Sequence, residues 1–289
     1  MLILCGLKTN KNFFKQFKMK AGLEIHQQLN TKEKLFCSCP TILSDKISKK
    51  IIRKLRAVAG ETGEVDIAAQ YEQIKGKCIE YEYHSDYACL VELDEEPPHL
   101  LNEEALKIAI ILSEFFEMYV PPVLQVMRKT VVDGSNTSGF QRTLLVGLNG
   151  KLKLKDKEIS IQTLCLEEDA ARKVEELPNK IAYRLDRLGT PLIEVATGPD
   201  LTSPEEVKEA AETIGLILRL TSSVKRGLGT IRQDINVSIP EGEKIEIKGA
   251  QDLKLIPKIV QNEINRQKKL LEWQKLVKER GIEGIKLMI

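Results

Sequence analysis

Three consecutive carboxylates, Glu167, Glu168 and Asp169, stand at the end of an apolar run that closes with Leu164, Cys165 and Leu166. Two negative charges about 4 Å apart repel each other by roughly 4 kcal/mol at an effective dielectric near 20. A solvated acidic turn is one interpretation of the triplet. At the end of a buried strand, however, the charge would need a cation, and carboxylate oxygens favour a hard ion such as Mg²⁺ or Ca²⁺.

Glu24 and His26 form a second polar pair, because they alternate with Leu23 and Ile25. The period of two in a β-strand places Glu24 and His26 on the same face. A carboxylate beside an imidazole can ligate a metal or hold a phosphate. A half-exposed strand with ordinary outward-facing polar residues is the alternative.

Glu194 lies between Ile193 and Val195 within an apolar stretch that reads as a strand. A carboxylate in such a place must be paired or metal-bound, because otherwise its pKa would rise until it became neutral.

A loop rich in small polar residues lies within 128–142, between two β-rich runs. Small residues let backbone N–H groups approach an anion, while hydroxyls and amides add donors. The GxxxxGK[ST] phosphate-loop spacing is absent, and a plain hairpin loop is the alternative. The candidate phosphate contacts are Asp133, Gly134, Ser135, Asn136, Ser138 and Gln141.

A second hairpin is predicted over 230–248, where Ile235 and Val237 alternate with polar residues. One face would then carry Arg232, Asp234, Asn236, Glu246 and Lys248. This set suits phosphates and metal together, and a solvent-facing sheet is the alternative.

The six cysteines, at positions 5, 37, 39, 78, 89 and 165, are too few for a disulfide scaffold in a chain of 289 residues. We therefore expect reduced thiols and a cytoplasmic protein. Zinc needs about four ligands, and no CxxC accompanies Cys37 and Cys39, so the pattern does not predict a zinc site. No apolar run reaches about 18 residues, so nothing is expected to span a membrane.

The expected elements are strands and helices in an α+β arrangement rich in antiparallel sheet. Helices are predicted over 44–57, 102–116, 203–220 and 255–280, and a hairpin over 151–166. We divide the chain into a basic leader (1–20), a main domain (21–254) and a C-terminal helical segment (255–289). The net charge of +2 does not by itself indicate a nucleic-acid partner.

The motifs exclude two common enzyme classes. There is no GxGxxG for a dinucleotide, and no Ser-His-Asp or Cys-His set stands out. Carboxylates, amides, basic residues and one histidine recur on strand-like elements. Such a set predicts a metal-bridged phosphate site, where positioning and charge neutralisation do the catalysis.

Several runs together resemble the B/E family of tRNA-dependent amidotransferase subunits. The resemblance covers roughly 21–281, and VDGSNTSGFQR and ELDEEPPH are similar to the archaeal E type. The other runs that carry it are GLEIHQQLNTK at 22–32, LEEDA at 166–170, RLGTPLIE at 187–194 and RQDINVS at 232–238.

The resemblance implies a catalytic cradle domain similar to glutamine synthetase in fold. It implies use of ATP and Mg²⁺ to phosphorylate the side-chain carboxylate of glutamate mischarged on tRNA(Gln). Ammonia from an amidase partner, the D-type subunit, would then displace the phosphate and give Gln-tRNA(Gln). Glu24, His26, Glu168 and Glu194 correspond by motif to metal-binding or ammonia-handling residues. A homo-oligomer or heterotetramer is expected.

Family members continue beyond this length, with an inserted synthetase-like domain and a helical tail that grips tRNA. We therefore expect a fragment or the product of a split gene. The alternative function is a non-catalytic remnant that scaffolds or docks the amidase partner.

Overall fold

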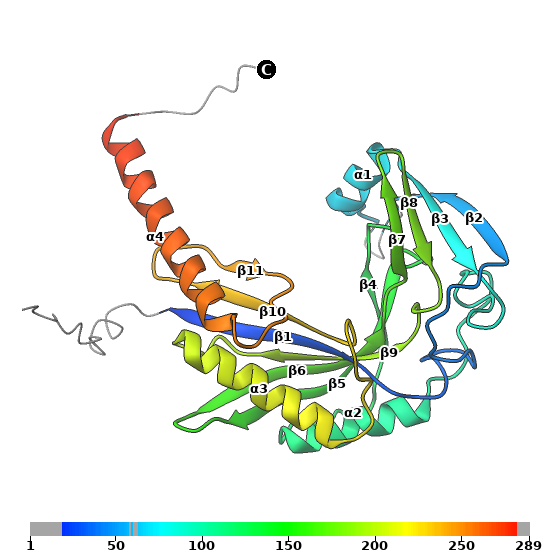
Figure 1. The fold of residues 1–289 in the computed structure, drawn as a ribbon, viewed down its shortest axis with the longest axis horizontal. Coiled ribbons are helices and arrows are strands. Elements are labelled where there is room, and N and C mark those ends of the chain that lie inside the picture. Colours follow the sequence, from blue (N-terminus) through cyan, green and yellow to red (C-terminus); the bar gives the residue numbers. More distant parts are fainter. Residues whose placement is uncertain (1–18, 58, 60–62, 282–289) are drawn as a thin grey trace, which may run out of the picture.

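A seven-stranded antiparallel sheet forms the floor of the molecule in the computed structural model, which describes residues 19–281 except 58 and 60–62 (Figure 1). In spatial order its strands are β11 (Ile245–Ile247), β10 (Ile231–Ser238), β1 (Lys20–Gln28), β9 (Pro191–Thr197), β6 (Glu158–Glu168), β5 (Phe140–Lys153) and β4 (Val126–Thr130). The antiparallel-rich α+β prediction is confirmed, and so are the predicted hairpins β5–β6 and β10–β11.

Three helices cover the apolar face of this sheet: α2 (Glu103–Phe115), α3 (Pro204–Leu220) and the first turns of α4 (Ile256–Glu279). Figure 1 shows α2 and α3 below the sheet and α4 rising from one end. Leu23, Ile25 and Ile214 are among the residues fully buried in the core between sheet and helices. The sequence starts α2 and α3 with capping side chains: Asn102 accepts the Ala105 N–H and Ser203 accepts the Glu206 N–H. The three predicted helices are confirmed.

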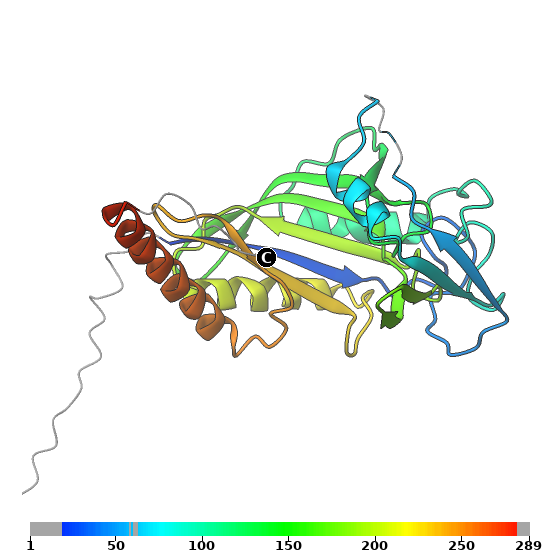
Figure 2. The same cartoon turned by 90° about the horizontal axis from the view of Figure 1, so that it is seen from above.

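A smaller four-stranded sheet stands at the other end of the floor (Figures 1 and 2). Its order is β2 (Lys49–Lys54), β3 (Cys78–Tyr83), β8 (Lys180–Arg184) and β7 (Arg172–Leu177), with β3 and β8 parallel. The short helix α1 (Ile67–Ile74) lies between β2 and β3 in the chain. A second core fills this region, where the rings of Tyr81 and Tyr183 stack with centroids 6.4 Å apart.

The basic helix predicted over 44–57 is wrong, because β2 occupies that segment. The strand pairs with β3, and Lys50 reaches Glu80 at 2.8 Å and Glu82 at 3.3 Å on that neighbour. Strand pairing and these cross-strand charges prevail over the weak helical pattern of the sequence.

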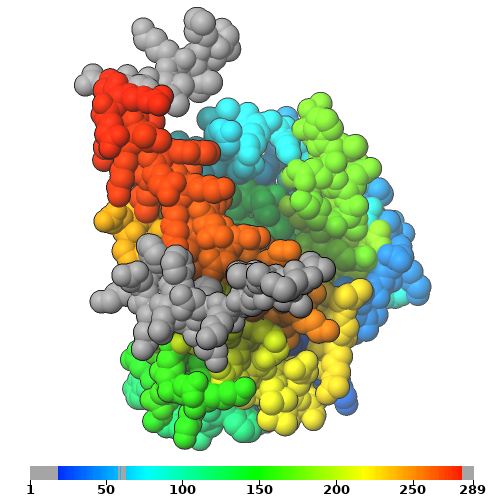
Figure 3. All heavy atoms as spheres, turned by 60° about the vertical axis from the view of Figure 1, so that its left-hand side comes forward, coloured from blue at the N-terminus to red at the C-terminus, as the bar shows by residue number. Residues whose placement is uncertain are grey.

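The predicted leader at 1–20 and the end of the predicted C-terminal segment lie mostly outside the described residues. Figure 3 shows the C-terminal turns of α4 projecting from the body. No described helix is long and apolar enough to cross a membrane.

Candidate functional site

The upper face of the large sheet is polar, and its residues come from strands distant in sequence. In the register of the sheet, His26 on β1 lies between Arg232 on β10 and Glu194 on β9. The apolar parity of the same strands faces the helices below, so their other parity is directed to this open face (Figure 2). The predicted strand face of Glu24 and His26 is confirmed, since both are half-buried between buried neighbours.

Four ionisable groups converge at the centre of this face. The Nε2 atom of His26 lies 3.0 Å from Glu194 Oε2 and 3.9 Å from Glu167 Oε1. Lys129, from β4, places its Nζ atom 2.9 Å from Glu194 Oε2 and 3.6 Å from Glu167 Oε2. The ligand atoms of His26, Glu167 and Glu194 all lie within 4.8 Å of one another, a spacing that could hold a metal ion.

The two carboxylates have different electrostatic environments. Burial and the nearby Glu194 charge raise the pKa of Glu167, although Lys129 and His26 oppose the rise. For Glu194, burial also favours the neutral form, but the hydrogen bonds from His26 and Lys129 outweigh it and hold the pKa at about 2. Glu194 is therefore ionised at neutral pH, and it is paired, as the sequence predicts for a carboxylate within an apolar strand.

The triplet 167–169 is buried, and each carboxylate has its own basic partner. Glu168 accepts two hydrogen bonds from Arg142 Nη1, each at 3.1 Å. Asp169 accepts from Gln28 at 2.6 Å and lies 3.3 Å from the guanidinium of Arg232. Basic side chains from three different strands, Lys129, Arg142 and Arg232, thus offset the repulsion among the three carboxylates. Glu168 pairs with Arg142, whereas its neighbour Glu167 lies beside Lys129.

Glu24, Asp234 and Asn236 extend the polar face along β1 and β10. Asn236 donates to Glu24 at 3.2 Å, and Asp234 is the register partner of Glu24. Asp234 also accepts the backbone N–H of Gly249 at 3.1 Å. Lys248, by contrast, is exposed and lies 3.6 Å from Glu246, at the outer edge of the sheet.

The loop between β4 and β5 is fixed against the smaller sheet. Tyr81 donates to the Gly134 carbonyl at 2.7 Å, and Tyr183 to the Asp133 carbonyl at 3.1 Å. Gly134 adopts a φ of 82°, which glycine accommodates without strain. The hairpin geometry predicted around this loop is confirmed, while its phosphate contacts stay a prediction.

Two further loop residues, Ser135 and Ser138, and the strand residue Gln141 make local hydrogen bonds. Ser135 donates its N–H to Asp133, Ser138 donates to the Phe140 carbonyl, and Gln141 donates to the Glu168 carbonyl at 2.6 Å. Among the described residues, the buried Asn136 Oδ1 has no hydrogen-bond partner. A buried acceptor without a partner is costly, so this oxygen is suited to receive a donor from a bound ligand.

A cavity of about 690 Å³ lies beside the Glu168–Arg142 pair. Phe140 lines it, with the guanidinium carbons of Arg142 and Arg128 5.5 and 5.7 Å from the ring centroid. Stacked guanidiniums of this kind can receive an anion or a planar group.

Sequence reasoning did not select Lys129 or Arg142, and it named Glu167 only as part of the acidic triplet and not among the residues assigned by motif. Glu167 carried a signal, since it begins the acidic triplet. Lys129 and Arg142 carried none, because their contacts depend on strand order: β4 and β9 are separated by β5 and β6 in the sheet, yet Lys129 reaches Glu194.

The family described as the GatB/GatE catalytic domain matches residues 19–286. The chain belongs to the GatB/GatE family. Proteins named as the E-type subunit of glutamyl-tRNA(Gln) amidotransferase are 54% identical in Methanocaldococcus jannaschii, 51% in Aeropyrum pernix and 52% in Saccharolobus solfataricus.

The aligned regions cover 92–93% of this chain but 42% of each relative. The chain thus spans less than half the length of the GatB/GatE relatives that it matches. The recognition of the archaeal E type from sequence motifs agrees with the names of these relatives.

Proposed function

We propose that this chain provides the activation site of a glutamyl-tRNA(Gln) amidotransferase. The site would use ATP to phosphorylate the side-chain carboxylate of glutamate on tRNA(Gln). Ammonia from an amidase partner would then convert the acyl phosphate to the amide. The convergence of His26, Glu167 and Glu194 on the open polar face is the observation that carries this proposal.

The residues fit a magnesium ion. Two carboxylates and one imidazole supply few but hard ligands, and Mg²⁺ commonly keeps several waters while it binds one or two carboxylates and substrate phosphates. Glu167 and Glu194 would hold the ion together with His26. When bound, the ion would neutralise charge between the phosphates and the glutamate carboxylate.

The chemistry explains why such a site is required. A carboxylate is a poor electrophile, and phosphorylation gives it a leaving group. In the first step a carboxylate oxygen bonds to the γ-phosphorus while the bond to ADP breaks. In the second, the nitrogen lone pair of ammonia attacks the acyl carbon, phosphate leaves with the C–O electrons, and the nitrogen releases a proton.

The remaining residues of the face would position the anionic groups. Arg232 is exposed at its side chain and is anchored by Asp169, so its guanidinium can receive a further anion. Lys129 lies against both central carboxylates and would adjust its contacts when a cation binds. We assign the loop 131–139, with its unpartnered Asn136 oxygen, to the nucleotide.

Trapping with hydroxylamine tests this function without the amidase partner. The 289-residue chain is incubated with Glu-tRNA(Gln), Mg²⁺ and ATP, and the γ-glutamyl hydroxamate is separated from the α-isomer that ester cleavage produces. We expect γ-hydroxamate only when ATP is present, and at least about tenfold less with Glu194→Gln.

Glu212→Gln is the matched control, because Glu212 is an exposed residue on α3 that pairs with Lys208. It should give the wild-type yield. A γ-hydroxamate yield independent of ATP at saturating Glu-tRNA(Gln) would contradict the proposed activity.

A further inference from the structure

The loop at 225–230 leads into β10, beside the polar face of the large sheet. Its base is fixed on the end of β1, where the buried Gln27 side chain donates to a carbonyl at each end of the loop, at 3.0 Å in both cases. Its tip is open to solvent, since Gly227 and Gly229 have φ angles of 118° and 79° and Leu228 between them is fully exposed. Glycine accommodates these angles without strain, so the chain holds a defined loop with an exposed tip.

The stretch that contains this loop has an excess of positive charge. No acidic residue occurs in 213–233, where the sequence has four basic residues. These are Arg219 on α3, Lys225 and Arg226 in the loop, and Arg232 on β10. A local excess of one sign of charge attracts ligands of the other sign, so the loop is suited to an anion.

Lys225 is a half-buried cation without a counter-ion. Its ammonium group donates to the Thr41 carbonyl, and no carboxylate among the residues that the structure describes forms an ion pair with it. Burial lowers the pKa of Lys225, while the charge of Asp169 opposes the decrease and that of Lys34 adds to it. An ammonium has three donors, so those not used on Thr41 can be given to the oxygens of an anion.

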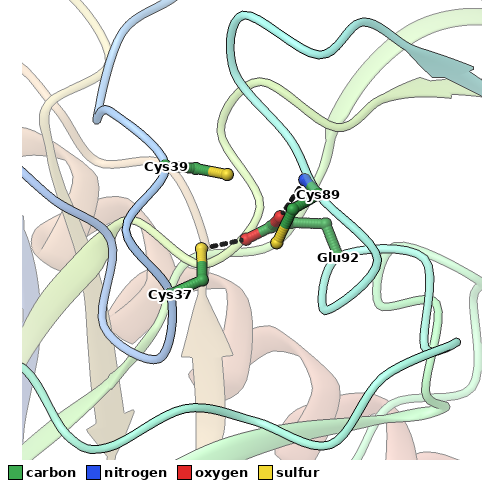
Figure 4. Close-up of side chains that lie close together, drawn as sticks. All are labelled: Cys37, Cys39, Cys89 and Glu92. Atoms are coloured by element: carbon green, nitrogen blue, oxygen red, sulfur yellow. Dashed lines mark hydrogen bonds between the residues drawn. The ribbon is translucent and has the colours of Figure 1, made fainter.

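The neighbouring lysine, Lys34, already has a carboxylate partner. Its Nζ atom lies 3.6 Å from Glu92 Oε1. Glu92 also accepts the Cys37 thiol at 2.9 Å and the Cys89 N–H at 2.8 Å (Figure 4). This carboxylate is thus surrounded by partners of its own, and the charge of Lys225 stays unpaired.

Arg232 stands beside the loop, and a buried carboxylate orients its guanidinium. The Nη2 atom of Arg232 lies 3.3 Å from Asp169 Oδ1, and Gln28 donates to Asp169 Oδ2 at 2.6 Å. The Arg232 side chain is still 45% exposed, so N–H groups remain for a ligand. In the register of the sheet Arg232 is next to His26, which lies 3.0 Å from Glu194. An anion on Arg232 would therefore lie at the edge of the central carboxylate cluster.

We propose that the 225–230 loop and Arg232 hold the single-stranded 3′ end of the RNA substrate, with Lys225 and Arg232 on its phosphates. This inference rests on the proposed function, in which the reacting glutamate is esterified to the last nucleotide of tRNA(Gln). The ester places the terminal phosphodiester close to the central carboxylates, where these two cations lie. Arg226 and Leu228 are exposed and would contact the unpaired bases, because single-stranded ends are bound through their phosphates and the faces of their bases together.

The position of the loop favours RNA over the nucleotide. The loop 131–139, which we assign to the nucleotide, follows β4, and β4 is separated from β10 by β5, β6, β9 and β1. The two regions would therefore approach the central carboxylates from opposite sides. Phosphorylation brings two anionic substrates together, and this arrangement gives each of them its own donors.

Two hairpin RNAs test the assignment. Both copy the acceptor stem of tRNA(Gln) and carry a fluorescent label in the hairpin loop, but only one has the unpaired 3′ end. Fluorescence anisotropy at several salt concentrations gives their dissociation constants with the 289-residue chain, and we expect tighter binding of the hairpin with the unpaired end. Lys225→Met should weaken that binding about tenfold and reduce its salt slope by about 1, with little effect on the blunt hairpin.

Arg219→Met is the matched control, because Arg219 is an exposed basic residue of the same stretch on α3. It should bind both hairpins as the wild-type chain does. Lys225→Met should melt no lower than the wild-type chain, because the change removes an unpaired and partly buried charge. Arg226→Gln changes an exposed residue, which keeps the test independent of folding, and should weaken binding of the unpaired end about threefold.

Equal affinity for the two hairpins, or binding of neither, would overturn the inference. So would a Lys225→Met chain that loses Mg²⁺-dependent binding of a non-hydrolysable ATP analogue but keeps its preference for the unpaired end, because the loop would then serve the nucleotide. Failure of the proposed function is a separate result. If no γ-hydroxamate forms, a preference for the unpaired end that depends on Lys225 would still support the loop as an RNA site.

Discussion

Lys129 supplies positive charge to both Glu167 and Glu194, so its removal should expose their mutual repulsion. We expect Lys129→Met to lower the free energy of unfolding by about 2 kcal/mol without divalent cations, because the buried Glu167 loses a partner. Millimolar Mg²⁺ should restore part of this loss, since an ion at the same carboxylates stabilises the folded state. Thermal unfolding at several Mg²⁺ concentrations measures both effects.

Lys208→Met is the control for that series, because Lys208 pairs with a single exposed carboxylate on α3. It should change stability by less than about 0.5 kcal/mol and leave the response to Mg²⁺ unaltered. An identical Mg²⁺ response in Lys129→Met and wild type would show that the ion does not bind between these carboxylates.

The Glu168–Arg142 pair is buried, with the two side chains 6% and 11% exposed. Breaking a buried pair leaves an uncompensated charge, so Glu168→Gln should cost about 3–5 kcal/mol of stability. Replacement of both partners, as in Arg142→Met with Glu168→Leu, should cost less than the single change. Urea unfolding of the two variants makes the comparison, and a double variant less stable than Glu168→Gln would refute this description of the pair.

Single positions were predictable where a local rule applied. Glu194 in an apolar strand required a hydrogen-bonding or ionic partner, and the structure gives it two, His26 and Lys129. The identity of those partners was not predictable, because a strand's neighbours in a sheet are set by tertiary contacts. For the same reason the sequence grouped Glu168 with the central carboxylates, whereas the structure pairs it with Arg142.

At the start of α3, Glu206 makes a contact that should depend on pH. Partial burial raises its pKa, but the hydrogen bonds from Lys157 and from the Thr202 N–H outweigh this and bring the pKa below its usual value. A depressed carboxyl pKa stabilises the folded state above the unfolded-state pKa of about 4.3, and this stability is lost as pH falls through the folded-state value.

We therefore expect Glu206→Gln to cost about 1 kcal/mol at pH 7, the usual size of a capping contribution. The difference from wild type should disappear as pH falls below about 4. Chemical unfolding at a series of pH values measures it. A difference that persisted unchanged at pH 3 would show that the charge of Glu206 does not contribute.

Helices with regular apolar spacing were the most predictable elements. The helices α2, α3 and α4 lie where the patterns indicated, and α2 and α3 also begin with the capping side chains of Asn102 and Ser203. The segment 44–57 was mistaken for a helix because its basic residues fit either structure. Only its pairing with β3, and the reach of Lys50 to two carboxylates there, specifies a strand.

The fold class of the whole molecule could be predicted from the sequence, but the arrangement of its two sheets could not. Alternating patterns indicated antiparallel strands, and hairpins connect β5 with β6 and β10 with β11. The small sheet was not predicted, because its parallel pair joins Tyr81 to Tyr183 across about a hundred residues of sequence.

We propose that the polar face of the large sheet holds Mg²⁺ for the phosphates of a nucleotide. Calorimetric titration of a non-hydrolysable ATP analogue into the 289-residue chain, with and without Mg²⁺, tests it most directly. We predict binding that requires Mg²⁺ and that weakens at least about tenfold in Glu194→Gln, with Glu212→Gln unchanged. Equal affinity with and without Mg²⁺, or wild-type binding by a folded Glu194→Gln variant, would contradict the claim.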